Sequence, residues 1–164
     1  MLIFVKNKHT LQVGDFKFRC CIGSKGSTMN KKEGDQKTPK GYYAIGNLYF
    51  RKDRKKKPKT SLKCIEIKKN MGWCNDIRFP KKYNKFFKIE KKIKHEKLKR
   101  KDYKYDFFIP IKYNDKKTVT GLGSCIFIHL TKDYNPTAGC IALKEKDFLI
   151  MLKLIKRNSK VKIF

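Results

Sequence analysis

A histidine and a cysteine stand eleven positions apart in the stretch IFIHLTKDYNPTAGCIAL, which covers residues 126–143. A free thiol is mostly protonated at neutral pH, and only its thiolate attacks carbonyl carbons. An imidazole beside the thiol can take its proton and later return it to a leaving amine. His129 and Cys140 are therefore a candidate general base and nucleophile for acyl transfer.

The residues around this pair predict how it would be positioned. Apolar alternation predicts a strand in which Cys125, Phe127 and His129 share one face. The polar TKDYNPT and the apolar IAL after Cys140 predict a hairpin, which would bring the two candidate groups across neighbouring strands, with Cβ atoms about 5 Å apart. Gly139 would let the backbone approach a substrate, and the N–H groups near it could hold an oxyanion. Spacing alone leaves a second reading open, in which both residues only pack near a hairpin.

Several motifs together resemble the L,D-transpeptidase catalytic domain, the YkuD-like family. Ile-Phe-Ile-His at 126–129, followed by Pro-Thr-Ala-Gly-Cys-Ile-Ala-Leu at 136–143, is similar to the core of its compact branch. The run EGDQKTPKG at 33–41 resembles its Gly-Asp-x-x-Thr-Pro-x-Gly element. YFRKDR, GWCNDIRFPKKYN and GLGSCIFIH resemble further elements of that branch, so the resemblance spans nearly the whole chain.

This resemblance implies a cysteine acyltransferase that acts on peptidoglycan stem peptides. Cys140 would attack the carbonyl of the diamino-acid residue in a stem tetrapeptide, D-alanine would leave, and an amine would resolve the thioester. His129 would be the base, with its ring oriented by a backbone carbonyl such as that of Leu130, and Gly139 would complete the catalytic motif. No metal or organic cofactor would take part. Water as the acceptor would instead make the protein an L,D-carboxypeptidase.

One position departs from the family pattern. Many members carry Ser/Thr-His-Gly-Cys, whereas Ala138 stands here in place of that second histidine. The spacing between His129 and Cys140 is also shorter than in the larger relatives. These departures leave the identity of the acyl acceptor open more than the identity of the nucleophile.

The remaining motifs contribute candidate substrate-binding residues. Arg51 and Arg54 could bind a substrate carboxylate through paired N–H groups, or they could simply be solvated. Gly123 and Ser124 could shape a cleft beside the histidine, or only begin the strand. Four residues of the stretch 72–84 could line a groove for the donor peptide or hold the loop over the core, namely Trp73, Asp76, Tyr83 and Asn84.

The pattern along the chain predicts a mainly β fold with minor α content, as an L,D-transpeptidase-like twisted β-sandwich in a single domain over 1–164. A strand is expected over 42–50, with a bulge or a close approach at Gly46, and another over 103–113, where Pro110 indicates an edge or a bulge. Apolar spacing predicts a short helix over 88–101 and a clearer one over 145–156. We therefore expect about eight strands and one or two helices.

Composition limits the class of protein. The net charge is +29. Such a surface attracts anionic polymers, but a general preference for lysine across the sequence is the favoured explanation. No nucleic-acid motif accompanies this charge, so a basic module using residues 51–59 and 81–108 is the weaker alternative. No run reaches the roughly 18 apolar residues of a membrane span, and the N-terminus does not resemble a signal peptide. The family resemblance would place the protein in the cell envelope or periplasm. A monomer with free cysteines is expected.

Overall fold

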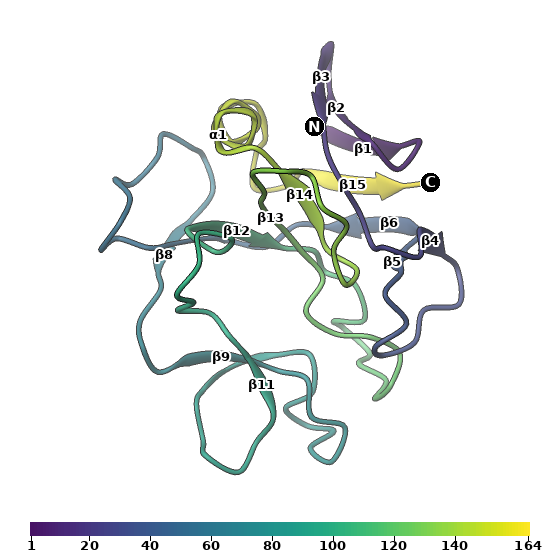
Figure 1. The fold of residues 1–164 in the computed structure, drawn as a ribbon, viewed down its shortest axis with the longest axis vertical. Coiled ribbons are helices and arrows are strands. Elements are labelled where there is room, and N and C mark those ends of the chain that lie inside the picture. Colours follow the sequence, from purple (N-terminus) through teal and green to yellow (C-terminus); the bar gives the residue numbers. More distant parts are fainter.

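The computed structural model describes all residues from 1 to 164, and short strands dominate it (Figure 1). One five-stranded sheet has the order β3-β2-β1-β15-β6 and consists of β1 Leu2–Lys6, β2 Thr10–Val13, β3 Phe16–Arg19, β6 Gly41–Ala44 and β15 Lys160–Ile163. The second has the order β14-β13-β12-β7-β8 and consists of β7 Leu48–Phe50, β8 Cys64–Glu66, β12 Phe107–Pro110, β13 Phe127–Leu130 and β14 Ile141–Leu143. The smaller elements are β4 Ser27–Thr28, β5 Thr38–Pro39, β9 Met71–Cys74, β10 Phe86–Lys88, β11 His95–Lys97 and the helix α1 Glu145–Leu154.

The second sheet is buried on both faces, which explains why β12 and β13 have no exposed position. On one face, Ile109 and Ile128 join the main core with the first sheet and α1. On the other face, Phe108 and Phe127 pack with Trp73 in a smaller cluster beneath β9 and β11. Figure 1 shows β9 and β11 on the opposite side of the second sheet from α1 and β1 to β3. The predicted fold class, mainly β with a small α component, is confirmed.

The helix expected over 145–156 is present and ends two residues early. Glu145 and Asp147 lie in its first turn, where negative charge complements the exposed N–H groups. Phe148 and Leu152 are fully buried against the main core. At ten residues, α1 is too short to cross a bilayer, and the structure has no longer helix.

The prediction of a helix over 88–101 is wrong. β10 and β11 instead pair antiparallel with the two edges of β9. The apolar positions Ile93 and Leu98 are buried as expected, but in a hairpin-like unit. Lysines recur at three- and four-residue spacing along this run, and on a helix their like charges would repel one another.

Two expectations around residue 46 turn out differently. The segment 42–50 is divided between β6 and β7, which belong to different sheets. The expected close approach is confirmed, because Gly46 donates its N–H to Pro110 O at 2.7 Å and a Cβ would lie 3.3 Å from that oxygen. Pro110 does not mark an edge, since β12 is the central strand of its sheet. The proline lies past the end of the β7 pairing, so its missing N–H removes no ladder bond on that side.

Candidate functional site

The strands that carry the candidate pair run parallel, so the expected hairpin is wrong. β13 pairs with β14 in a register that sets His129 opposite Ala142 and Ile128 opposite Ile141. Cys140 comes immediately before β14, and it points to the same face as Ala142 because side chains alternate along a strand. The histidine and the cysteine are therefore diagonal neighbours across the small side chain of Ala142.

The backbone before Cys140 is held from behind by the EGDQKTPKG motif. Thr38 is fully buried, and its hydroxyl donates to Gly139 O at 2.8 Å while accepting the Gly23 N–H at 2.9 Å. Gly139 has φ +141°, and a Cβ there would lie 2.9 Å from Lys37 O. Only glycine fits this position without strain, so the motif fixes where the cysteine begins its strand.

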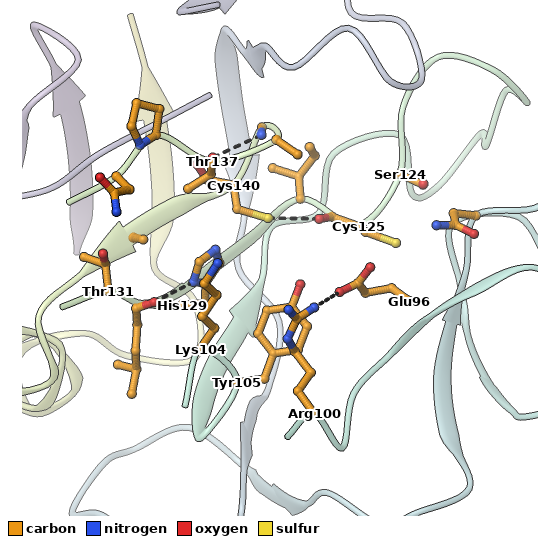
Figure 2. Close-up of a pocket in the computed structure, with 18 of the residues that line it drawn as sticks. Glu96, Arg100, Lys104, Tyr105, Ser124, Cys125, His129, Thr131, Thr137 and Cys140 are labelled. Atoms are coloured by element: carbon orange, nitrogen blue, oxygen red, sulfur yellow. Dashed lines mark hydrogen bonds and ion pairs between the residues drawn. The ribbon is translucent and has the colours of Figure 1, made fainter. Parts of the chain in front are cut away.

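His129 and Cys140 line one cavity of about 420 Å³. Figure 2 shows the imidazole ring and the sulfur in neighbouring positions at its wall, with Thr131 and Lys104 on the histidine side. Cys125, Glu96 and Ser124 lie on the other side of the sulfur. The cavity therefore extends in both directions from the sulfur.

Backbone groups hold the thiol of Cys140 in place. The thiol donates to Cys125 O at 3.2 Å, and its sulfur accepts the Phe127 N–H at 3.4 Å. Thr137 Oγ1 accepts the Gly139 N–H at 3.1 Å and donates to Cys140 O at 2.6 Å. The Cys140 N–H has no hydrogen-bond partner in the structure. Of the Gly139 and Cys140 amides, that of Cys140 is therefore the one free to donate to an oxyanion.

The ring of His129 is fixed in one orientation. Its Nδ1 lies 2.9 Å from Leu130 O, and a carbonyl oxygen only accepts, so Nδ1 carries the proton and Nε2 has the free lone pair. The ring of Tyr105 packs against the imidazole in a T-shaped arrangement, with centroids 5.5 Å apart. The imidazole thus presents a basic nitrogen to the cavity while its other nitrogen is occupied.

Burial keeps both groups neutral at pH 7. Burial raises the pKa of the Cys140 thiol to about 12, and the nearby Glu96 carboxylate acts in the same direction. Burial likewise lowers the pKa of His129 to about 4. No hydrogen bond joins the sulfur and the imidazole in the structure. The resting pair is a thiol and a neutral imidazole, and a proton would move between them only when the sulfur attacks.

The buried imidazole makes stability depend on pH. In the unfolded chain it takes up a proton near pH 6.5, whereas the folded chain resists protonation down to about pH 4. The contribution of His129 to the free energy of unfolding should therefore be constant above pH 6.5 and fall by up to about 3 kcal/mol between pH 6.5 and 4. Urea titrations across this range would measure the fall. His129→Gln should flatten it, and the exposed control His9→Gln should retain it; equal slopes in all three proteins would contradict the assignment.

The candidates in the stretch 72–84 hold the loop in place. Asn84 accepts from Trp73 Nε1 and from the Cys125 N–H, both at 3.1 Å. Its amide donates to Tyr113 O and Asn114 O, both at 2.9 Å. None of the four candidates from this stretch lines the cavity. Asp76 binds Arg78 and the Lys94 N–H, and the Tyr83 hydroxyl donates to Glu33 Oε2.

Asn84→Ala should lower the free energy of unfolding by about 3 kcal/mol. The change leaves two donors and two carbonyl oxygens without their hydrogen-bond partners, and each such loss destabilises the fold. It also places alanine at φ +54°, a conformation that asparagine tolerates better. Denaturant titration would measure the loss. The matched control Asn30→Ala, whose exposed side chain makes no hydrogen bond, should cost less than about 0.5 kcal/mol. Similar values for both variants would show that this network is not stabilising.

The other candidates divide between the cavity and the rest of the fold. Ser124 lines the cavity and donates to Glu33 Oε2 at 2.7 Å. Gly123 does not line it, and its φ of +96° sets up the approach to β13. Arg51 and Arg54 also lie outside. Arg51 is buried and paired with Asp53 at 2.7 Å, and the guanidinium of Arg54 binds the carbonyls at 101 and 102.

Sequence reasoning missed several cavity residues. Glu96, Arg100, Lys104 and Tyr105 all line it, and all come from the lysine-rich run that was considered for nucleic-acid binding. The signal that could have indicated Glu96 is its carboxylate within a lysine-rich run, in a chain whose net charge is +29. Its proximity to Cys140 depends on the β9–β11 pairing, which local patterns do not reveal.

The sequence model of the family YkuD, described as the L,D-transpeptidase catalytic domain, matches residues 1–163. No match was found among curated proteins. Among solved structures, one titled "Structure of Bdellovibrio bacteriovorus Bd1075" is similar, with a TM-score of 0.48 and 14% identity. The similarity covers 99% of this chain and 47% of that chain, so this chain spans about half the length of that structure.

Proposed function

Because the chain belongs to the YkuD family of L,D-transpeptidase catalytic domains, we propose that Cys140 is its nucleophile and His129 its general base. Membership implies a cysteine enzyme with L,D-transpeptidase-type activity on peptidoglycan. One observation carries the finer assignment: His129 on β13 and Cys140, immediately before the adjacent β14, line the same cavity. The proposal extends to the compact Pro-Thr-Ala-Gly-Cys branch and to a single catalytic domain over residues 1–164.

The first half-reaction forms a thioester. The diamino-acid carbonyl of a stem tetrapeptide meets Cys140, and the thiol proton passes to Nε2 of His129 as the sulfur–carbon bond forms. The developing oxyanion accepts a hydrogen bond from the Cys140 N–H, the amide left without a partner. The bond to D-alanine then breaks, and the imidazolium returns the proton to the departing amine. The products are free D-alanine and an acyl group on the sulfur.

The second half-reaction transfers the acyl group to an amine. An amine of a second stem peptide, or of a protein, attacks the thioester carbonyl and gives one proton to His129. The carbon–sulfur bond breaks, and the imidazolium protonates the departing sulfur. The resting thiol and neutral imidazole are restored, so the neutral pair described above suits both half-reactions.

A carbapenem tests this proposal, because its strained amide acylates a nucleophilic cysteine. Intact-mass analysis should show one adduct per chain, and peptide mapping should place it on Cys140. With a tetrapeptide and an amine acceptor, a cross-linked product and D-alanine should appear together. An adduct on a different cysteine, or none, would overturn the assignment. D-Alanine release without cross-linking would make water the acceptor and the protein an L,D-carboxypeptidase.

A further inference from the structure

We propose that Glu96 and Asn75 form a subsite for a primary ammonium group of the substrate, within the cavity of Cys140. The proposal deepens the function above and rests on it for the identity of the substrate. The subsite itself is inferred from the charges and unpaired acceptors of the cavity wall.

The charges around this cavity differ from those of the rest of the protein. The chain carries a net charge of +29, but three basic and three acidic residues line the cavity, so their charges cancel: Lys31, Arg100, Lys104, Glu33, Glu96 and Asp133. A cation that the rest of the surface repels would meet no net positive charge here.

Glu96 contributes a negative charge that its partner does not neutralise. Arg100 Nη1 donates to Glu96 Oε1 at 2.8 Å. The same guanidinium is already paired with Asp102, through Nε at 3.0 Å and Nη2 at 2.7 Å. Two carboxylates thus share one guanidinium, and the group keeps one negative charge. Glu96 Oε2 accepts no hydrogen bond, and the side chain is 27% exposed, so this oxygen remains open to a ligand.

A second acceptor lies beside the carboxylate. Glu96 pairs with Trp73 across the β9–β11 ladder, and Asn75, two residues further along that chain segment, points to the same face. Asn75 lines the cavity, and its Oδ1 is buried without a hydrogen-bond partner. Buried polar oxygens are almost always paired, so this carbonyl marks a position for a donor that the protein does not supply.

These acceptors match an ammonium group. An ammonium carries one compact charge and three N–H donors pointing in different directions, and the carboxylate and the amide oxygen approach from two residues on one face. Occupancy would also act on the nucleophile. Burial is the main cause of the raised pKa of the Cys140 thiol, and the charge of the Glu96 carboxylate raises it further. The same carboxylate also raises the pKa of the Tyr105 hydroxyl. A bound ammonium would cancel that charge and make the thiolate easier to form.

Three methanethiosulfonate reagents test the subsite without any peptide. Each transfers its group to a thiol as a mixed disulfide and releases methanesulfinate; they carry a 2-aminoethyl, a 2-(trimethylammonium)ethyl or a methyl group. Rates at Cys140 would be measured by peptide mapping and divided by the rates with glutathione. The aminoethyl reagent should be favoured over the methyl reagent by about tenfold. The trimethylammonium reagent, which has no N–H, should be favoured less.

Variants make the test specific. Glu96→Gln should bring the normalised ratio close to one, Asn75→Asp should raise it, and Glu90→Gln, an exposed control in the same hairpin, should leave it unchanged. A ratio near one in the wild type, or a preference that survives Glu96→Gln, would overturn the subsite. Cys140 inert to all three reagents would show a closed cavity and would overturn both proposals.

Peptide substrates then identify the source of the ammonium. If the donor carries it, acetylating the side-chain amine of the tetrapeptide should raise KM for D-alanine release about tenfold in the wild type and little in Glu96→Gln. If the acceptor carries it, the same acetylation should leave D-alanine release unchanged, and Glu96→Gln should raise KM for the acceptor. An effect on neither substrate would overturn the subsite's role in turnover. A cation preference in the reagent assay without any turnover would contradict the transpeptidase proposal alone.

Discussion

Cys140→Ala should abolish the carbapenem adduct and lower turnover of a stem tetrapeptide by at least about a thousandfold. The sulfur forms the covalent intermediate, and alanine has no group that can replace it. Five other cysteines remain in the variant; of these, Cys125 lines the cavity, on the side of the Cys140 sulfur away from His129. Intact-mass analysis and D-alanine release would measure the two effects.

The matched control for this variant is Cys64→Ala. Cys64 is a partly buried free thiol on β8, outside the cavity, so its loss should leave both the adduct and the turnover unchanged. Circular dichroism should show the same fold for all three proteins. An adduct of equal yield on the wild type and Cys140→Ala would show that Cys140 is not the nucleophile.

His129→Gln should reduce kcat/KM by about a hundredfold to ten-thousandfold. Glutamine can preserve the contact with Leu130 O, but it cannot accept the thiol proton. The thiol would then have to ionise by itself, against a pKa of about 12. Steady-state kinetics over a range of pH would separate this loss from a general loss of structure.

The pH profile is the diagnostic of this second variant. Wild-type kcat/KM should rise through about pH 4, where the imidazole loses its proton, and then level off. The variant should instead gain about tenfold per pH unit from neutral to alkaline pH, because the thiolate fraction grows by that factor. The exposed substitution His9→Gln should retain the wild-type profile. A plateau at neutral pH in His129→Gln would show that another group accepts the proton.

Local patterns in the sequence predicted those features that depend on neighbouring residues. The alternation around β13 predicted that Phe127 faces away from Ile128, and the structure places Phe127 in the smaller cluster and Ile128 in the main core. The stripe of Phe148 and Leu152 predicted α1 in the same way. Both follow from periodicity, which each segment carries by itself.

Pairing between distant segments could not be predicted in this way. The expected hairpin between β13 and β14 is instead a parallel pair. The polar residues that connect the two strands do not distinguish an antiparallel from a parallel arrangement. The helix expected over 88–101 became strands because β9 offered two edges. The approach of Glu96 to the cysteine depends on that pairing, so it was invisible in a sequence read segment by segment.

The small sheet of β9 to β11 meets the second sheet through a separate aromatic cluster, and this division has an evolutionary consequence. Mutations at positions of this sheet that line the cavity, such as Glu96, can accumulate without changing the parallel pairing of β13 with β14. The substrate preference proposed for the Glu96 subsite can therefore change while the positions of His129 and Cys140 stay constant. Replacing the segment from β9 to β11 with the equivalent segment of a relative that prefers a different substrate should transfer that preference.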